Sequence, residues 1–119
     1  MKYLVTDDSK LARRVLKKSL CQFVDEKNVY EACDGLEALK MLLKKKLGII
    51  FLDLTMPVMD GYEAIPKILD INPDIKIVVV SADIQEKAKE RVLALGATMH
   101  VAKPINPLKM KEILDLLKL

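Results

Sequence analysis

Short apolar runs and longer stretches of helical periodicity alternate along the chain. The apolar runs predict five strands, at residues 2–6, 28–32, 49–52, 76–80 and 98–102. Apolar residues at helical spacing predict five helices, at residues 10–23, 36–47, 60–71, 83–95 and 106–117. Because crossovers between parallel strands are right-handed, these strand–helix units predict an α/β fold, a doubly wound (βα)5 parallel sheet with helices on both faces.

The helical spacing also predicts which side chains face the core. In the first two helices the expected stripes consist of Leu11, Val15 and Phe23, with Ala12, Leu16 and Leu20 alongside, and of Leu36, Leu39, Leu43 and Leu47. In the fourth helix the expected stripe is Ile84, Ala88, Val92 and Leu95. Four basic residues gather on the other face of the first helix, namely Arg13, Arg14, Lys17 and Lys18. We interpret this face as solvated, with a partner surface as the alternative.

Residues near the predicted helix ends have capping chemistry. Ser9 and Asn106 stand where N-caps are expected. Two pairs have the spacing of a capping box, Asp60 with Glu63 and Asp83 with Glu86. Pro66 removes one backbone donor early in the third helix, so we expect a delayed start or a mild kink there.

The composition narrows the class of protein. The length of 119 residues fits one domain, residues 1–119, and 51% hydrophobic with 31% charged residues is typical of a soluble globular protein. The start of the chain lacks the long apolar region of a secretory signal, so we expect a cytoplasmic protein without membrane contact. A net charge of +3 spread over many lysines argues against nucleic acid as a ligand. Cys21 and Cys33 lack the spacing of zinc or thioredoxin motifs and are interpreted as buried, reduced thiols.

Polar residues follow four of the predicted strands directly. They are Asp7 and Asp8 after the first strand, Asp53 after the third, Ser81 after the fourth and Lys103 after the fifth. Ligands of doubly wound sheets bind outside the carboxyl ends of the strands, near the point where strand order reverses. We therefore expect these side chains to share one crevice.

Three carboxylates in one crevice would repel each other unless they share a divalent cation, and an all-oxygen site favours Mg²⁺. Direct ligands would come from Asp8, Asp53 and a backbone carbonyl just after Asp53, that of Thr55, while Asp7 would act through water. Lys103 and Ser81 beside the metal would suit a phosphoryl group. Asp53, at the centre, is then the candidate nucleophile for an aspartyl phosphate.

Four separated motifs resemble the receiver domain of response regulators, in particular stand-alone CheY-like proteins. They are Asp7-Asp8, the segment from Asp53 to Gly61, Ser81-Ala82 and Lys103-Pro104, and the likeness covers essentially the whole chain. The resemblance implies strand order 2-1-3-4-5, a cis peptide bond before Pro104, Asp8 as a direct Mg²⁺ ligand, and phosphorylation of Asp53 by a sensor histidine kinase or a phosphotransfer protein.

The resemblance also implies a switch. In receivers the residue matching Ser81 moves toward the phosphoryl group and an aromatic residue three positions before the lysine changes its rotamer. His100 occupies that position here, so we interpret it either as the reporter of phosphorylation or as an exposed strand residue. Thr55 and Asp83 stand where the family tunes the lifetime of the phosphoryl group.

The implied output is a contact with a downstream protein on the last two strand–helix units, whose candidate surface residues include Lys87, Met99, Ile105 and Lys109. Nothing follows the last helix that could carry a DNA-binding module, so we expect a monomer that signals through protein contacts, in chemotaxis or as a phosphorelay intermediate or phosphate sink. A fragment of a larger regulator is the alternative.

Two other functions are compatible with parts of the pattern. A Mg²⁺-dependent aspartyl-phosphate phosphatase of the haloacid-dehalogenase kind would need an acidic residue two positions after Asp53, where Thr55 stands. A small flavin carrier on the same fold would need a hydroxyl- and glycine-rich phosphate loop after the first strand, where the chain has Asp7-Asp8-Ser9.

Overall fold

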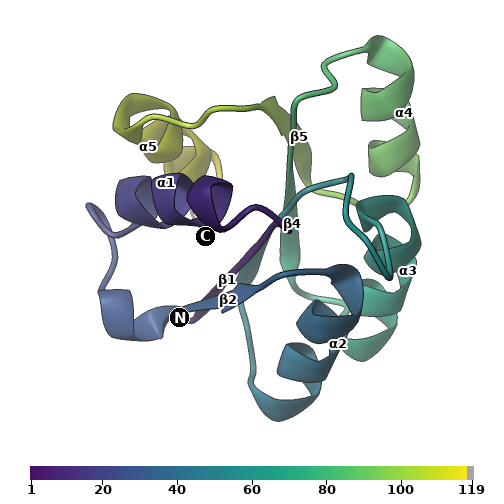
Figure 1. Cartoon of the computed structure of the whole chain (residues 1–119), viewed down its shortest axis with the longest axis horizontal. Coiled ribbons are helices and arrows are strands. Elements are labelled where there is room, and N and C mark those ends of the chain that lie inside the picture. Colours follow the sequence, from purple (N-terminus) through teal and green to yellow (C-terminus); the bar gives the residue numbers. More distant parts are fainter. Residues whose placement is uncertain (118–119) are drawn as a thin grey trace.

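A computed structural model describes residues 1–117 and contains one parallel five-stranded sheet (Figure 1). Its strands are β1 (Tyr3–Thr6), β2 (Val29–Ala32), β3 (Ile49–Leu52), β4 (Lys76–Ser81) and β5 (Met99–Ala102). They lie in the order β2-β1-β3-β4-β5, which confirms the predicted doubly wound topology. Residues 118–119, the end of the predicted domain, lie outside the described part.

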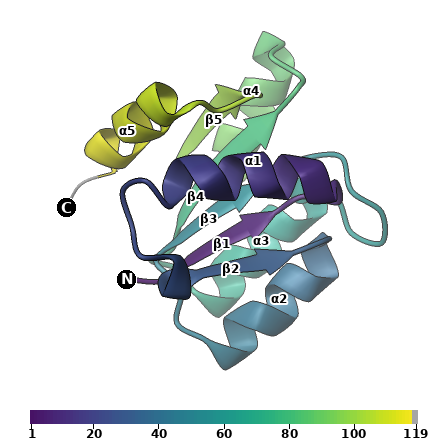
Figure 2. The same cartoon turned by 60° about the vertical axis from the view of Figure 1, so that its left-hand side comes forward.

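Five α-helices cover the two faces of the sheet. They are α1 (Lys10–Leu20), α2 (Gly35–Lys44), α3 (Gly61–Ile71), α4 (Glu86–Ala94) and α5 (Pro107–Leu116), and a short 3₁₀ turn at Glu26–Asn28 precedes β2. Helices α1 and α5 pack on one face, and α2, α3 and α4 on the other (Figures 1 and 2). Within residues 1–117 no helix combines the length and the apolar composition needed to cross a bilayer.

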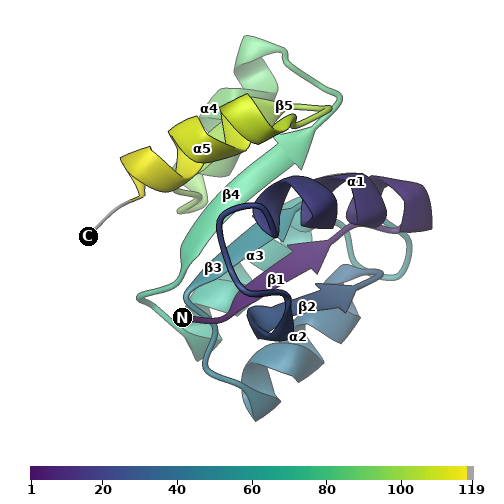
Figure 3. The same cartoon turned by 90° about the vertical axis from the view of Figure 1, so that its left-hand side faces the viewer.

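The central strands are buried on both faces, as their unbroken apolar sequences predict. Ile50 of β3 contributes to the core under α2 and α3, whereas Phe51 contributes to the core under α1 and α5. β1 lies between β2 and β3, with Thr6 opposite both Ala32 and Leu52. Because of this register the strands end at the same level, so the loops that follow β1 and β3 lie together at the C-terminal end of the sheet (Figure 3).

Side-chain caps start four of the five helices. Ser9, Asp34, Asp60 and Asn106 each accept a hydrogen bond from a backbone N–H in the first turn of α1, α2, α3 and α5 respectively. The predicted delay caused by Pro66 is wrong, because Asp60 starts α3 directly at Gly61. The predicted Asp83 cap is also wrong: Gln85 is the N-cap of α4, and Asp83 instead accepts from the Gln85 N–H at 3.0 Å.

Several predicted core positions face solvent. The relative exposures are 68% for Leu11, 73% for Leu43 and 70% for Ile84, and Val15, Phe23 and Leu36 are also exposed. In α1 the predicted core residues Leu16 and Leu20 are buried, and Ser19 is buried with them. Each of these helices carries apolar residues on two adjoining arcs, and helical spacing alone cannot tell which arc meets the sheet.

The two cysteines are free, as predicted, but only half-buried. The Cys33 thiol donates to Glu37 Oε2 at 3.1 Å, and that hydrogen bond, together with burial, raises the pKa of Cys33. Burial likewise raises the pKa of Cys21. Both side chains therefore stay protonated thiols near neutral pH.

Candidate functional site

Three carboxylates converge where β1 and β3 end. Oxygen atoms of Asp7, Asp8 and Asp53 all lie within 4.8 Å of one another. Asp7 and Asp53 are only 6% and 7% exposed, whereas Asp8 is open to solvent. A half-open set of oxygen donors fits a cation such as Mg²⁺, which keeps several water ligands, better than it fits zinc or copper.

Lys103 places a cation between two of these acids. Its Nζ lies 2.6 Å from Asp7 Oδ2 and 3.2 Å from Asp53 Oδ1. The residue directly follows β5, and its backbone N–H donates to the Ser81 carbonyl at 3.0 Å. The Lys103–Pro104 peptide bond is cis, as the resemblance implies.

The charges of the site shift two pKa values in a consistent way. Burial raises the pKa of Asp53, the negative charge of Asp7 raises it further, and Lys103 opposes both. Burial by itself would lower the pKa of Lys103, but its hydrogen bond to Asp7 and the charge of Asp53 outweigh burial and raise that pKa. One ammonium thus faces a surplus of negative charge that a divalent cation would balance.

Protein contacts engage every polar group of Asp7. Its N–H donates to the Ala32 carbonyl at 3.2 Å, and its own carbonyl accepts from Arg13 Nη1 at 2.7 Å. Its Oδ1 accepts from the Ser9 N–H at 2.9 Å, and its Oδ2 accepts from Lys103. Asp7 is therefore fixed from four directions, and its exposed neighbour Asp8 has the freer carboxylate.

The loop after β3 is packed tightly beneath Asp53. The Asp53 N–H donates to the Thr6 carbonyl, and the Gly61 N–H donates to the Leu54 carbonyl, both at 2.9 Å. A Cβ atom at Gly61 would lie 2.5 Å from the Asp53 carbonyl oxygen and 2.9 Å from Leu54 Cα. Only a glycine therefore lets α3 start this close to the strand end that carries Asp53. Met56 and Met59 are buried in this loop.

Ser81 lies on the strand next to β3, at the buried end of β4. Its hydroxyl oxygen accepts a hydrogen bond from the Asp83 N–H at 3.0 Å. Asp83 and Thr55 are both exposed, the first in the loop after β4 and the second in the loop after β3. The two positions predicted to tune hydrolysis are thus open to water.

His100 is half-buried on β5, which argues against the interpretation of it as an exposed strand residue. Its Nε2 atom is buried and has no hydrogen-bond partner within residues 1–117. Of the predicted partner-face residues, Lys87 and Lys109 are exposed and Met99 is half-buried. Ile105 is only 2% exposed, so its assignment to that surface is wrong. It packs in the core below α1, where its carbonyl accepts from the Ser19 hydroxyl at 2.9 Å.

A mostly apolar pocket of about 240 Å³ adjoins the acidic residues. Its walls include Leu11 and Val15 of α1, two of the residues wrongly predicted to be in the core. Asp53 and Lys103 also line it. The approach to Asp53 from the α1 side therefore passes over apolar side chains.

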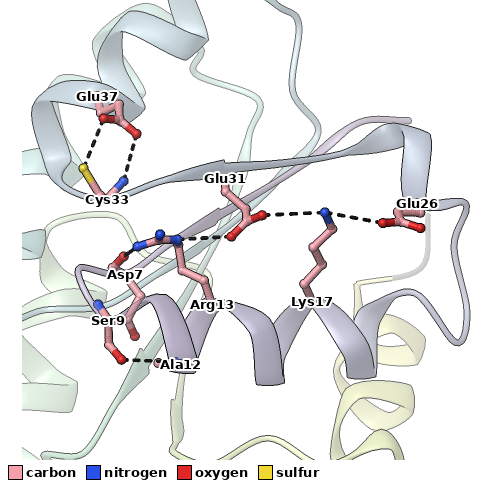
Figure 4. A network of polar contacts seen from close by, with 9 residues as sticks. All are labelled: Asp7, Ser9, Ala12, Arg13, Lys17, Glu26, Glu31, Cys33 and Glu37. Carbon is pink, nitrogen blue, oxygen red and sulfur yellow. Dashed lines mark hydrogen bonds and ion pairs between the residues drawn. The ribbon is translucent and has the colours of Figure 1, made fainter.

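Arg13 is a site neighbour that the sequence interpretation missed. It was assigned to a solvated basic face, yet its side chain is only 16% exposed and reaches both Asp7 and Glu31 (Figure 4). Helical side chains lean toward the N-terminus, so an arginine in the first turn after an acidic pair points back at that pair. The lean of helical side chains could therefore have predicted the contact between Arg13 and Asp7.

Comparison with known proteins agrees with the geometry. A family model described as the response regulator receiver domain matches residues 3–115. The chain is 34% identical over 115 residues to the chemotaxis protein CheY of Listeria monocytogenes, covering 97% of this chain and 96% of that protein. It also matches 27% of a protein-glutamate methylesterase/protein-glutamine glutaminase of Azospirillum brasilense, with 36% identity over 112 residues. The chain thus spans nearly all of one relative and about a quarter of the other.

Solved structures show the same fold. Chemotaxis protein CheY4 of Vibrio cholerae superposes with a TM-score of 0.89 and 28% identity, covering 98% of both chains. A CheX–CheY–BeF3–Mg²⁺ complex from Borrelia burgdorferi contains a chain that superposes with a TM-score of 0.87 and 25% identity, covering 100% of this chain and 90% of that one.

Proposed function

This chain belongs to the response regulator receiver domain family and is a response regulator of two-component signalling, and we propose that it accepts its phosphoryl group on Asp53. The observation that carries this proposal is the position of Asp53, a buried carboxylate in contact with Lys103 and within 4.8 Å of two further acids. Family membership favours this function over an aspartyl-phosphate phosphatase or a flavin carrier.

Asp8, Asp53 and the Thr55 carbonyl would hold Mg²⁺, and Asp7 would contact it through water. The saturated contacts of Asp7 and the exposure of Asp8 support this division, because only the second carboxylate is free to turn toward a cation. When bound, Mg²⁺ would neutralise charge on the transferred phosphoryl oxygens.

In the proposed transfer an Asp53 carboxylate oxygen attacks the phosphorus of a phosphohistidine. The new bond is the O–P bond of an acyl phosphate, the N–P bond breaks, and the histidine leaves as neutral imidazole when its other ring nitrogen carries a proton. Lys103 Nζ, already 3.2 Å from Asp53, would then donate to a phosphoryl oxygen. The Ser81 hydroxyl would supply a second donor from β4.

The donor would be a sensor histidine kinase or a phosphotransfer protein, and the output a protein contact through β4, α4, β5 and α5. Exposed Lys87 and Lys109 and half-buried Met99 support this surface. The similarity to chemotaxis proteins favours chemotaxis as the pathway. In this proposal residues 1–119 form one receiver unit that works as a monomer.

Two further roles belong to the same proposal. Thr55 and Asp83, both exposed beside the site, would control water access to the aspartyl phosphate and so its lifetime. His100 would report phosphorylation by turning inward beside Ser81, where its buried Nε2 gains a partner. Structures with and without a bound phosphomimic should differ in the His100 rotamer, and identical rotamers would contradict this role.

The decisive experiment is to mix the protein with Mg²⁺ and acetyl phosphate and to measure intact mass. We expect one added phosphoryl group, absent when Mg²⁺ is chelated before acetyl phosphate is added and absent in Asp53→Asn. Labelling that persists in the variant would refute the assignment of Asp53. Release of phosphate from many ester molecules per protein would instead indicate a phosphatase.

A further inference from the structure

Arg13 connects the loop that carries the acidic pair to the outer strand of the sheet. Its Nη1 donates to the Asp7 carbonyl at 2.7 Å, and its Nε donates to Glu31 Oε1 at 3.1 Å (Figure 4). Lys17 Nζ lies 3.6 Å from the other Glu31 oxygen and 3.7 Å from Glu26 Oε1. Glu31 thereby restrains the Arg13 guanidinium, and the guanidinium in turn holds the loop that carries Asp7.

The atom that Arg13 holds is well placed to orient Asp8. The Asp7 carbonyl and the Asp8 nitrogen and Cα belong to one planar peptide unit, so fixing the carbonyl fixes where the Asp8 side chain begins. Asp8 itself is exposed, and no side-chain hydrogen bond within residues 1–117 restrains its carboxylate. Its direction is therefore set by the backbone, and the backbone is set in part by Arg13.

We propose that Arg13 is a positioning residue for the metal site: it orients the Asp7–Asp8 peptide so that Asp8 points toward a bound cation, and Glu31 holds the arginine in place. The inference rests on the proposed function in taking Mg²⁺ as the cation. The two side-chain hydrogen bonds of Arg13 require the planar fork of a guanidinium, because a lysine ammonium on a flexible stem cannot make both with the same geometry.

Whether removal of Arg13 weakens or strengthens Mg²⁺ binding distinguishes a positioning role from a purely electrostatic one. Arg13 is a cation next to an acidic pocket, so through-space repulsion alone predicts that its removal strengthens Mg²⁺ binding. Loss of positioning predicts the opposite. Arg14 offers the matched control, because it is exposed on the same helix and forms no ion pair within the described residues.

The test is a calorimetric titration of Mg²⁺ alone into the unphosphorylated protein. Residues that orient metal ligands typically contribute about 10–100-fold to affinity, so Arg13→Met should raise the Mg²⁺ Kd about tenfold. Arg14→Met should leave the Kd unchanged or lower it. Glu31→Gln should raise it about threefold, since it removes the partly exposed ion pairs of Glu31 with Arg13 and Lys17.

Arg13→Lys guards against misfolding, because it keeps the charge and the stem. We expect it to unfold like the wild type and still to bind Mg²⁺ more weakly. A Kd for Arg13→Met equal to or below that of Arg14→Met, or full affinity in Arg13→Lys, would overturn the inference. A wild type that binds Mg²⁺ but is never phosphorylated would refute the proposed function and leave this result standing.

Discussion

The two sides of the site are built differently. On the side of β1 and β3, Asp7 is held by four contacts and the backbone at Asp53 is pressed against Gly61. On the side of β4 and β5, the Ser81 hydroxyl accepts from the adjacent loop, and His100 Nε2 is without a hydrogen-bond partner within residues 1–117. In the same part of the chain α4 alone starts without a side-chain cap.

This difference matches a division of labour in the proposed function. Phosphoryl transfer depends on groups held in position before the reaction, and its acidic residues, Asp7, Asp8 and Asp53, lie on the side of β1 and β3. Signal output needs an element with two arrangements of similar free energy, and such elements come from the less stable parts of a fold. Four substitutions should distinguish the two sides of the site.

Lys103→Met should have the strongest effect, because Lys103 reaches from the end of β5 to the carboxylates of Asp7 and Asp53. Removing the ammonium that contacts both Asp7 and Asp53 should slow labelling by acetyl phosphate about 100-fold, as loss of one donor to developing charge typically does. The raised pKa of Lys103 means that the ammonium stabilises the fold at every pH below the ordinary lysine value of about 10.4, and that this contribution is lost as pH rises through the folded pKa.

The control is Lys87→Met, which removes the same charge from an exposed position on α4. Equal labelling rates in the two variants, measured by intact mass over time, would show that the charge at Lys103 has no special position.

Gly61→Ala should destabilise the protein by about 2 kcal/mol, the cost of forcing an extra carbon into a packed site. The new Cβ meets backbone atoms of Asp53 and Leu54, which cannot move without shifting β3 or α3. Gly48→Ala is the matched control, because the three atoms nearest to its Cβ all belong to the flexible side chain of Met1. Urea unfolding should separate the two variants clearly, and equal midpoints would contradict the tight packing.

Asp53→Asn should stabilise the metal-free protein at pH 7 by about 1 kcal/mol. The folded pKa of Asp53 is raised, so its contribution to stability is full below the unfolded value of about 3.9 and is lost as pH rises through the folded pKa. At neutral pH the ionised carboxylate therefore costs free energy, which the amide avoids.

The difference between Asp53→Asn and wild type should vanish near pH 3, where both side chains are neutral. Urea unfolding at both pH values, with a chelator present, provides the measurement. A variant less stable than wild type at pH 7 would contradict the surplus of negative charge at this site.

Gln85→Ser should have the smallest effect, a gain of about 0.5 kcal/mol, because serine can supply the cap that α4 lacks. Asn106→Ser, which exchanges one capping residue for another on α5, should change the unfolding free energy little. No gain in Gln85→Ser would mean that the start of α4 is limited by something other than its cap.

The sequence predicts the elements and the polar strand ends well, because both depend on local pattern. Hydrophobic runs predicted every strand. The rule that sites of doubly wound sheets lie at the carboxyl ends of the strands correctly predicted that Asp7, Asp8, Asp53 and Lys103 lie together. Choices between two equivalent local patterns failed. Leu11 and Leu16 have the same helical periodicity with their neighbours, and only the packing of α1 on the sheet decides that the second is buried.

Arg13 and Asp83 show a second limit. An arginine and an aspartate near a helix start have several partners within reach, and the choice depends on loop geometry over distances of 6 and 2 residues. Arg13 turned toward the Asp7 carbonyl instead of solvent, and Asp83 bonded Gln85 instead of capping α4. Residue type identified the chemistry in both cases, but not the partner.

Glu31 also affects how readily two copies of the chain associate through the sheet. It lies on β2, an outer strand of the sheet whose four residues leave one backbone edge unpaired within the described chain. An open edge is a template for pairing with a second molecule, and short strands with charged side chains turned toward the protein's own helices are a recognised defence. Arg13 and Lys17 hold Glu31 in that orientation, so substitutions here should also raise the tendency to aggregate.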